Sequence, residues 1–202
     1  MKKFLMLLAA LVMILLSGCA GSAPTVAEKK VFYTQVNMWY VEKSYKQKQS
    51  AHDFSVSRNE DALASNYRID STNYKRDYLI PINSPVEIVE SDDYAIFFIY
   101  QNKLIAMENI ARHTKIDTAK LLERSFKEEK VDLSMYTPER RAEITKGKIV
   151  KGMSKATVLL ARGYPPEHKT PDLQSDNWRY WNGKFNSRMF HFEEGKYVTF
   201  TD

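Results

Sequence analysis

The side chain with the most distinctive chemistry in this sequence is Cys19, the only cysteine among 202 residues. A thiol is a nucleophile and a disulfide partner, and a single cysteine excludes a disulfide within the chain. Cys19 follows the basic start Met1-Lys2-Lys3 and an uncharged apolar run from Phe4 to Leu16. This order is typical of a secretory signal peptide over residues 1–18. Thirteen apolar residues at ~1.5 Å each are too short for a ~30 Å membrane core.

Leu16-Ser17-Gly18-Cys19 resembles the lipobox of bacterial lipoproteins. The resemblance implies that the signal is removed and that Cys19 becomes the N-terminus, carrying diacylglycerol and an N-acyl chain. Each acyl chain contributes ~0.8 kcal/mol per buried methylene, and two or more chains anchor a protein stably. Ala20 stands where aspartate is the usual inner-membrane retention signal of Gram-negative lipoproteins. The resemblance therefore implies a periplasm-facing outer-membrane lipoprotein, and an ordinary secretory signal with a chance cysteine is the alternative.

The remaining side chains form no catalytic or metal-binding pattern. The four histidines lie far apart in the sequence, without the paired spacing of metal ligands, at His52, His113, His168 and His191. The sequence contains no nucleophile elbow, phosphate loop or dinucleotide fingerprint, and its adjacent acids are not placed as a glycosidase pair. We therefore expect no enzyme, no metal and no cofactor beyond the lipid on Cys19.

The charge pattern does not favour nucleic acid as a partner. The formal net charge of +5 falls to about +3 when residues 1–18 are removed. Acids and bases alternate, as in Lys127-Glu128-Glu129-Lys130, which is typical of a solvated surface. Stability must come from packing, for which ten Phe, twelve Tyr and three Trp supply large apolar side chains.

The first half of the mature chain has β character. Residues 19–30 are mostly small or polar and predict a flexible tether. Residues 31–114 predict a β-rich region, with a polar excursion at 42–66 that lacks the apolar content of a core. We expect strands within 31–40, 67–74, 78–90, 95–100 and 104–110. Several short strands of this kind favour a small barrel or curled sheet.

Residues 67–112 loosely resemble bacterial SH3-like domains, in which Leu-Ile-Pro-x-x-(Ser/Thr)-x-Val-x-Ile forms the first tight hairpin. The corresponding residues run from Leu79 to Ile88, with Asn83 where glycine is common. The resemblance implies an SH3-like β-barrel. Binding of peptidoglycan by such a barrel would need an aromatic cleft, with candidates Trp39, Tyr40, Tyr67 and Tyr74.

The hydrophobic period changes near residue 115, and capping residues predict a helical connection over 115–146. Asp117 is a good N-cap for a helix over 118–129. Thr137 followed by Pro138 predicts a second helix that ends near residue 145.

The C-terminal segment predicts one helix followed by a three-stranded meander. Ser154 is the expected N-cap, and Met153 and Val158 form a hydrophobic staple. Gly163 is placed for the left-handed position that ends this helix. Strands are expected at 177–181, 189–192 and 197–200, with a turn at Asn182-Gly183.

Residues 147–201 resemble the small outer-membrane-assembly lipoproteins of the BamE (SmpA/OmlA) type. The resemblance is carried by Gly152-Met153-Ser154-Lys155, Gly163-Tyr164-Pro165, Trp178-Arg179-Tyr180 and Gly195-Lys196-Tyr197-Val198. Arg162 departs from the family pattern, in which leucine is usual, and so does the second proline, Pro166. The resemblance implies a two-layer domain over 147–202, with helices packed on an antiparallel three-stranded meander.

The expected fold class is therefore α+β: an SH3-like barrel or curled sheet, a helical connection and a BamE-like domain. The first functional hypothesis is a non-catalytic envelope lipoprotein that acts as a scaffold or assembly factor on an envelope or outer-membrane protein. The second is a peptidoglycan-binding lipoprotein. The third is an inhibitor or regulator of an envelope enzyme, by fold analogy with β-lactamase-inhibitor proteins.

The irregular loop 163–176 is the expected partner contact, because a rigid loop loses little entropy on binding. The candidate binding residues are Tyr164, Pro165, Pro166, Lys169 and Asp172. In the competing interpretation, Tyr164 only covers the end of the preceding helix against Trp178.

Overall fold

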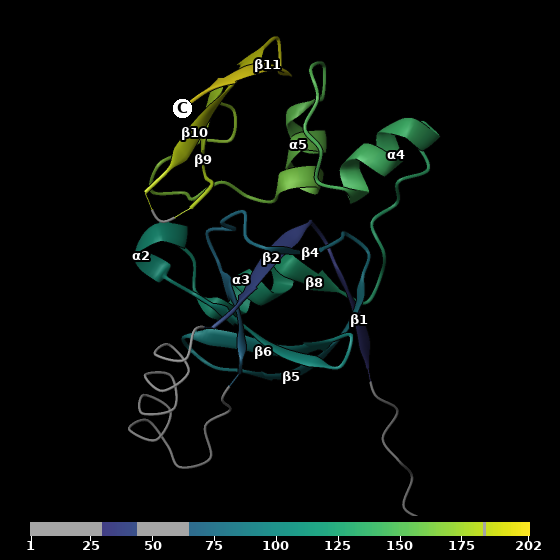
Figure 1. The fold of residues 1–202 in the computed structure, drawn as a ribbon, viewed down its shortest axis with the longest axis vertical. Helices are drawn as coiled ribbons and strands as arrows, with labels where there is room; N and C mark the ends of the chain where they lie inside the picture. Colours follow the sequence, from purple (N-terminus) through teal and green to yellow (C-terminus); the bar gives the residue numbers. More distant parts are fainter. Residues whose placement is uncertain (1–29, 44–64, 184) are drawn as a thin grey trace, which may run out of the picture.

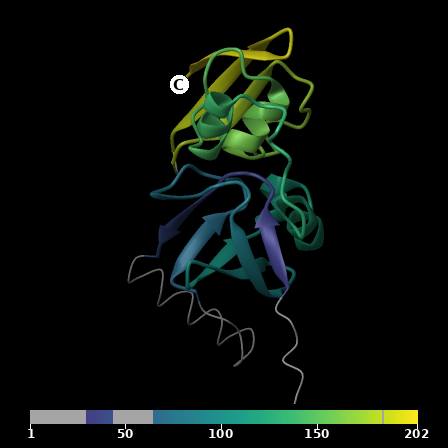
Figure 2. The same cartoon turned by 90° about the vertical axis from the view of Figure 1, so that its right-hand side faces the viewer.

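The computed structural model describes residues 30–43, 65–183 and 185–202, which form an α+β structure with two β-sheets. Cys19, nearly all of the predicted tether and most of the polar excursion at 42–66 lie outside these residues. Figures 1 and 2 show the first sheet in the lower part of the molecule and the C-terminal sheet stacked on one end of it. Within these three ranges, no helix has both the length and the apolar character needed to cross a membrane.

The first sheet is a mixed half-barrel of eight strands in the order β4-β2-β3-β7-β6-β5-β1-β8. Its strands are β1 (Val31–Thr34), β2 (Met38–Glu42), β3 (Tyr67–Asp70), β4 (Tyr78–Ile80), β5 (Pro85–Ser91), β6 (Ala95–Tyr100), β7 (Lys103–Glu108) and β8 (Phe126–Lys127). All neighbours are antiparallel except β3 and β7, which run parallel. The curled, β-rich first half that the sequence predicts is confirmed.

Two tight turns in this sheet place non-glycine residues at positive φ. Gln101 and Asn102 join β6 to β7 with φ of 47° and 60°. Asn83 lies in the turn between β4 and β5 with φ of 65°, a conformation that Asn adopts more readily than most side chains. The Asn83 side chain also exchanges two hydrogen bonds with the backbone of Val131, at 2.9 and 2.7 Å. This turn therefore holds the chain segment that leads towards the C-terminal helices.

The core of the first sheet is closed by helix α3 (Thr118–Ser125), which follows the single turn α2 (Ala111–Thr114). Leu121 of α3 and Phe126 of β8 are buried against Ile96, Phe98 and other side chains of the sheet. The predicted N-cap is confirmed, because Asp117 Oδ1 accepts a hydrogen bond from Lys120 N at 2.7 Å.

The predicted end of this helix at residue 129 is wrong. Phe126 is extended, with φ −139° and ψ 133°, and pairs with Thr34 of β1. The Phe126 ring is buried against Phe98, with ring centres 5.0 Å apart. This packing and the strand pairing together outweigh helix propensity at Phe126.

Helices α4 (Pro138–Thr145) and α5 (Lys155–Arg162) precede the second sheet. The predicted caps are confirmed, because Thr137 Oγ1 accepts from Arg140 N at 3.2 Å and Ser154 Oγ from Thr157 N at 3.1 Å. Met153 and Val158, the predicted staple, are both buried in the second core. Gly163 has a positive φ of 80°, but its ψ of −178° is extended, so the predicted left-handed cap is wrong in ψ.

The second sheet is an antiparallel meander in the order β11-β10-β9. Its strands are β9 (Asn177–Trp181), β10 (Ser187–Glu193) and β11 (Lys196–Thr201). Alternate side chains of this sheet, Trp178, Tyr180, Phe190, Phe192 and Tyr197, form its core with Met153 and Val158. The predicted meander is confirmed. Its first turn is longer than an Asn-Gly pair, because the last paired residues before and after it are Trp181 and Ser187.

We expect Gly163→Ala to destabilise the protein more than Gly152→Ala. Both glycines have positive φ, 80° and 86°, so alanine costs about 1 kcal/mol or more at either position. A Cβ at Gly163 would lie 1.8 Å from Asn73 Nδ2, whereas nothing lies within 4 Å at Gly152. The steric conflict should add about 1–3 kcal/mol at Gly163. Urea unfolding of the two variants measures this difference, and equal losses would contradict the close contact with Asn73.

Candidate functional site at the junction of the two sheets

The C-terminal end of α5 points at the first sheet, and that sheet supplies the partners of its last carbonyl groups. A helix leaves its final carbonyl groups without hydrogen-bond donors from within the helix. The Leu160 carbonyl accepts a hydrogen bond from Asn37 N at 3.1 Å, and the Ala161 carbonyl accepts one from Asn37 Nδ2 at 2.9 Å. The Arg162 carbonyl accepts one from Asn73 Nδ2 at 2.6 Å. Two asparagines from the loops around β2 and β3 therefore cap α5.

Asn37 uses its whole carboxamide in this junction. It is fully buried, and its Nδ2 also donates to the Ile144 carbonyl at 2.6 Å. Its Oδ1 accepts from Ile82 N at 2.7 Å. One side chain thus connects α4, α5 and the turn before β5. A buried carboxamide satisfied in this way has a single favourable orientation.

Arg162 lies at the centre of the same junction. Its Nη1 donates to the Asn73 carbonyl and its Nη2 to the Trp181 carbonyl, both at 2.8 Å. The guanidinium lies 4.8 Å from the ring of Trp39 and 5.1 Å from that of Tyr180. Burial lowers its pKa to about 10, so Arg162 stays protonated at neutral pH. It joins the second sheet to the first through hydrogen bonds and ring contacts on both sides.

A groove runs beside this junction, between α3 and α5. Its volume is about 630 Å³, in the range of ligand pockets. It is lined by Gln35, Val36, Lys120, Glu123, Arg124, Lys127, Val131, Ala156, Leu159, Leu160 and Tyr164. α5 supplies small and apolar side chains, whereas α3 and β8 supply all four charged ones. Such a groove can bind a ligand through apolar contact on one wall and ionic contact on the other.

Arg124 and Tyr164 meet at one edge of the groove. The Arg124 guanidinium lies 4.3 Å from the centre of the Tyr164 ring, a cation–π contact. Partial burial lowers the pKa of Arg124, while Tyr164 and Glu167 act in the opposite direction. Tyr164 is half-buried and packs against the core of the first sheet.

The predicted contact loop has a buried part and an exposed part. Pro165 and Pro166 are buried, so they are packing residues and not an open rigid surface. Lys169 and Asp172 are exposed, and Asp172 Oδ1 accepts a hydrogen bond from Gln174 N at 2.7 Å. Of the five predicted binding residues, only Tyr164 lines the groove. Trp178, its expected packing partner, belongs to the second core.

Two histidines that are distant in the sequence lie against each other. His113 of α2 and His168 of the loop after α5 have ring centres 4.4 Å apart at an interplanar angle of 24°. His168 N donates to the His113 carbonyl at 3.1 Å. Arg112 Nε donates to His113 Nε2 at 3.3 Å, which requires that ring nitrogen to be unprotonated. The pair is therefore a second contact between the two halves of the molecule.

His191 is placed as its strand position predicts. Phe190 and Phe192 are buried, while His191 is half-exposed on the opposite face of β10. Its ring nitrogens lie 2.7 Å from Asn177 Oδ1 and 2.9 Å from Thr201 Oγ1. His52 lies outside the described residues. Within the described ranges, no group of three His, Cys, Asp or Glu side chains is arranged to hold a metal.

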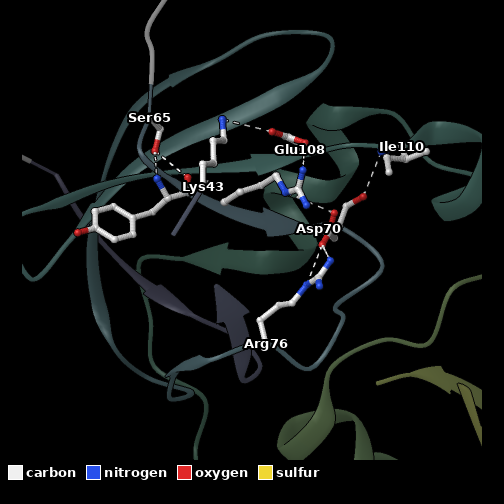
Figure 3. A network of polar contacts seen from close by, with 9 residues as sticks. Lys43, Ser65, Asp70, Arg76, Glu108 and Ile110 are labelled. Atoms are coloured by element: carbon white, nitrogen blue, oxygen red, sulfur yellow. Dashed lines mark hydrogen bonds and ion pairs between the residues drawn. The ribbon is translucent and has the colours of Figure 1, made fainter. Parts of the chain in front are cut away.

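A ladder of charges covers the parallel pair of β3 and β7 (Figure 3). Asp70 accepts from Arg76 Nη2 at 2.8 Å and lies 3.7 Å from Arg68 Nε. Glu108 lies 3.8 Å from Arg68 Nη1 and 3.5 Å from Lys43 Nζ. Charges of opposite sign alternate along the ladder, so each is compensated by its neighbours. We interpret it as a stabilising element of the parallel pair.

The functional residues that sequence reasoning missed are those that meet only in the fold. Asn37 offered one signal, because it is a polar residue inside a predicted strand, and Arg162 offered another, because it is a charged residue at the end of a predicted amphipathic helix. Asn73, Arg124 and the stacking of His113 on His168 carry no local signal. Their contacts depend on chain segments dozens of residues away.

Comparison with known proteins adds no identification: no family model, no curated protein and no solved structure matches this chain.

The stacked histidines predict a loss of stability in mild acid. Desolvation, then His168 and the cations Arg112, Lys115 and Lys169, lower the pKa of His113. The unfolded chain, with an ordinary pKa of ~6.5, therefore binds more protons below that pH. Stability should fall as the pH drops through ~6.5, level off below the folded pKa, and be unaffected by this group at higher pH.

NMR titration of the His113 ring tests this expectation directly. The pKa of His113 should lie below ~6.5 in the wild-type protein and move back towards it in His168→Phe, which keeps a ring but removes its charge. A pKa of His113 at or above its usual value would contradict the compact pair.

Proposed function

We propose that this chain is a non-catalytic lipoprotein of the bacterial envelope, anchored through acylated Cys19, that acts as a scaffold or assembly factor. The observation that carries the proposal is the α5 junction. Asn37, Asn73 and Arg162 fasten the two sheets into one body, and an open groove follows the seam between them. A body of fixed geometry with a groove at its seam suits a protein that positions a partner.

The arrangement of the C-terminal part supports a BamE-like domain within this proposal. Helices α4 and α5 come first, and the meander β9, β10 and β11 follows and buries aromatic side chains against α5. The first sheet does not contain the hairpin expected from Leu79 to Ile88, because β4 pairs with β2 whereas β5 pairs with β1 and β6. Only the curled, half-barrel shape of this sheet supports an SH3-like region.

The location that we propose is the periplasmic face of the outer membrane. It is supported by the lipobox, by Ala20 after the cysteine and by the resemblance of residues 147–201 to outer-membrane-assembly lipoproteins. The partners in this proposal are the membrane, through the lipid, and an envelope or outer-membrane protein.

The peptidoglycan-binding alternative is less well supported. It needs an aromatic cleft, and two of its four candidates, Trp39 and Tyr40, are buried. Trp39 packs under Arg162, and Tyr40 stacks on Tyr78 at 5.1 Å. The enzyme-inhibitor alternative rests on fold analogy alone.

We expect Cys19→Ser to release the protein from the membrane. Without the acylated thiol, no lipid remains to hold the chain, so the variant should be found folded in the soluble periplasmic fraction. Fractionation with a carbonate wash, compared with wild type, measures the effect. A variant that stays in the washed membrane would refute the lipid anchor.

We also expect partner contacts to map to the groove. A photo-crosslinking amino acid placed at Ala156 of α5 or Glu123 of α3, both exposed, should give a discrete adduct in intact cells. Glu90 of β5, an exposed position outside the groove lining, is the matched control. Identical adducts at all three positions, or none at Ala156 and Glu123, would refute the scaffold proposal. Retention of the protein on purified sacculi would favour the peptidoglycan alternative.

A further inference from the structure

Arg124 has hydrogen-bonding capacity that the described part of the chain does not use. Its guanidinium contacts the Tyr164 ring but makes no hydrogen bond or ion pair with a described residue. A guanidinium carries five N–H donors in a planar fork. The Tyr164 ring lies 4.3 Å from the guanidinium and accepts no conventional hydrogen bond from it, so these donors remain available to a ligand.

The environment of Arg124 increases its value as an anion anchor. The side chain is partly buried, which lowers its pKa and strengthens any ionic contact that it makes. The cation–π contact fixes its orientation before a ligand arrives, so less side-chain entropy is lost on binding. A carboxylate matches the fork with two parallel hydrogen bonds.

The rest of the groove limits what can carry that carboxylate. Ala156, Leu159 and Leu160 lie on one side of α5 and give an apolar wall. The charged lining contains three cations, Lys120, Arg124 and Lys127, against the single acid Glu123. Glu167 also interacts with Arg124 from outside the lining, and the cations still outnumber the two acids. Lys120 is 3.7 Å from Asp117, so Arg124 and Lys127 are the cations best placed to attract a ligand. The groove is therefore complementary to an apolar ligand with negative charge.

We propose that the groove between α3 and α5 binds a short apolar segment of a partner protein, with an aspartate or glutamate of that segment held by Arg124. This inference rests on the proposed scaffold function and names the chemistry of its partner. Leu159 and Leu160 receive the apolar side chains, and the Arg124 fork receives the acid. A volume of about 630 Å³ suits a few side chains and not a whole protein surface.

The test selects peptides without assuming their sequence. The lipidated full-length protein in nanodiscs is used to select from a displayed library of random dodecapeptides, and Ala156→Arg, which fills the groove, is the counter-selection. Selected peptides should combine two or more large apolar residues with an acid. They should lose at least about tenfold in affinity on Ala156→Arg.

A double-mutant cycle then isolates the contact with Arg124. A selected peptide is compared with its Glu→Gln or Asp→Asn form on the wild type, on Arg124→Gln and on Arg124→Lys. Loss of a charge-assisted contact should weaken the acidic peptide about tenfold or more on Arg124→Gln, with little change for the amide peptide. Arg124→Lys should retain part of the affinity. Lys196→Gln, on exposed β11, should leave it unchanged.

Three outcomes would overturn the inference. The first is selection of apolar peptides without an acid, and the second is equal weakening of both peptide forms by Arg124→Gln. The third is binding of phosphatidylglycerol vesicles that Ala156→Arg abolishes, which would assign the groove to lipid. Crosslinks from Ala156 in cells that do not depend on an aspartate or glutamate of the partner would refute only this inference. Peptide binding that depends on such a residue, without crosslinks in cells, would refute the scaffold proposal instead.

Discussion

The last carbonyl groups of α5 need hydrogen-bond donors from outside the helix, and the rest of the molecule depends on this constraint. They are buried at the meeting of two sheets, where unpaired acceptors would be costly. Asn37 and Asn73 supply the missing donors from loops beside β2 and β3, and Tyr180 supplies one more, to the Gly163 carbonyl at 2.8 Å. α5 therefore depends on the loops of the first sheet for donors at its C-terminal end, and the two sheets share a hydrogen-bonded surface there.

Several features follow from this capping of α5 by the first sheet. Gly163 has no side chain because Asn73 occupies the space beside it. Arg162 can be buried because it donates to the Asn73 and Trp181 carbonyls and because the rings of Trp39 and Tyr180 contact its guanidinium. Gly147 makes room for the Trp39 ring, which would lie 2.8 Å from a Cβ there. Because α5 ends at the first sheet and α3 packs beneath that sheet, the space left between the two helices is the groove that Arg124 and Tyr164 border.

Features encoded locally could be predicted from the sequence. Asp117, Thr137 and Ser154 cap helices because each side chain bonds a backbone amide three residues on, and the aromatic alternation of the last strands fixes which face is buried. Long-range features could not. Phe126 leaves its helix to pair with β1, β3 finds β7 in parallel, and His113 meets His168, each through contacts that no local pattern encodes. Of the predicted contact loop, only Tyr164 reaches the groove, because Pro165 and Pro166 are buried in packing.

The position of β1 has a mechanical consequence. β1 is the first strand of the described residues. It lies between β5 and β8, with an antiparallel partner on each side. A tension applied through the N-terminus along this strand loads the hydrogen bonds to both neighbours together, in shear. They then resist as a group and do not open one after another. β8 in turn continues directly from α3, so such a load is shared with the helix that closes the core.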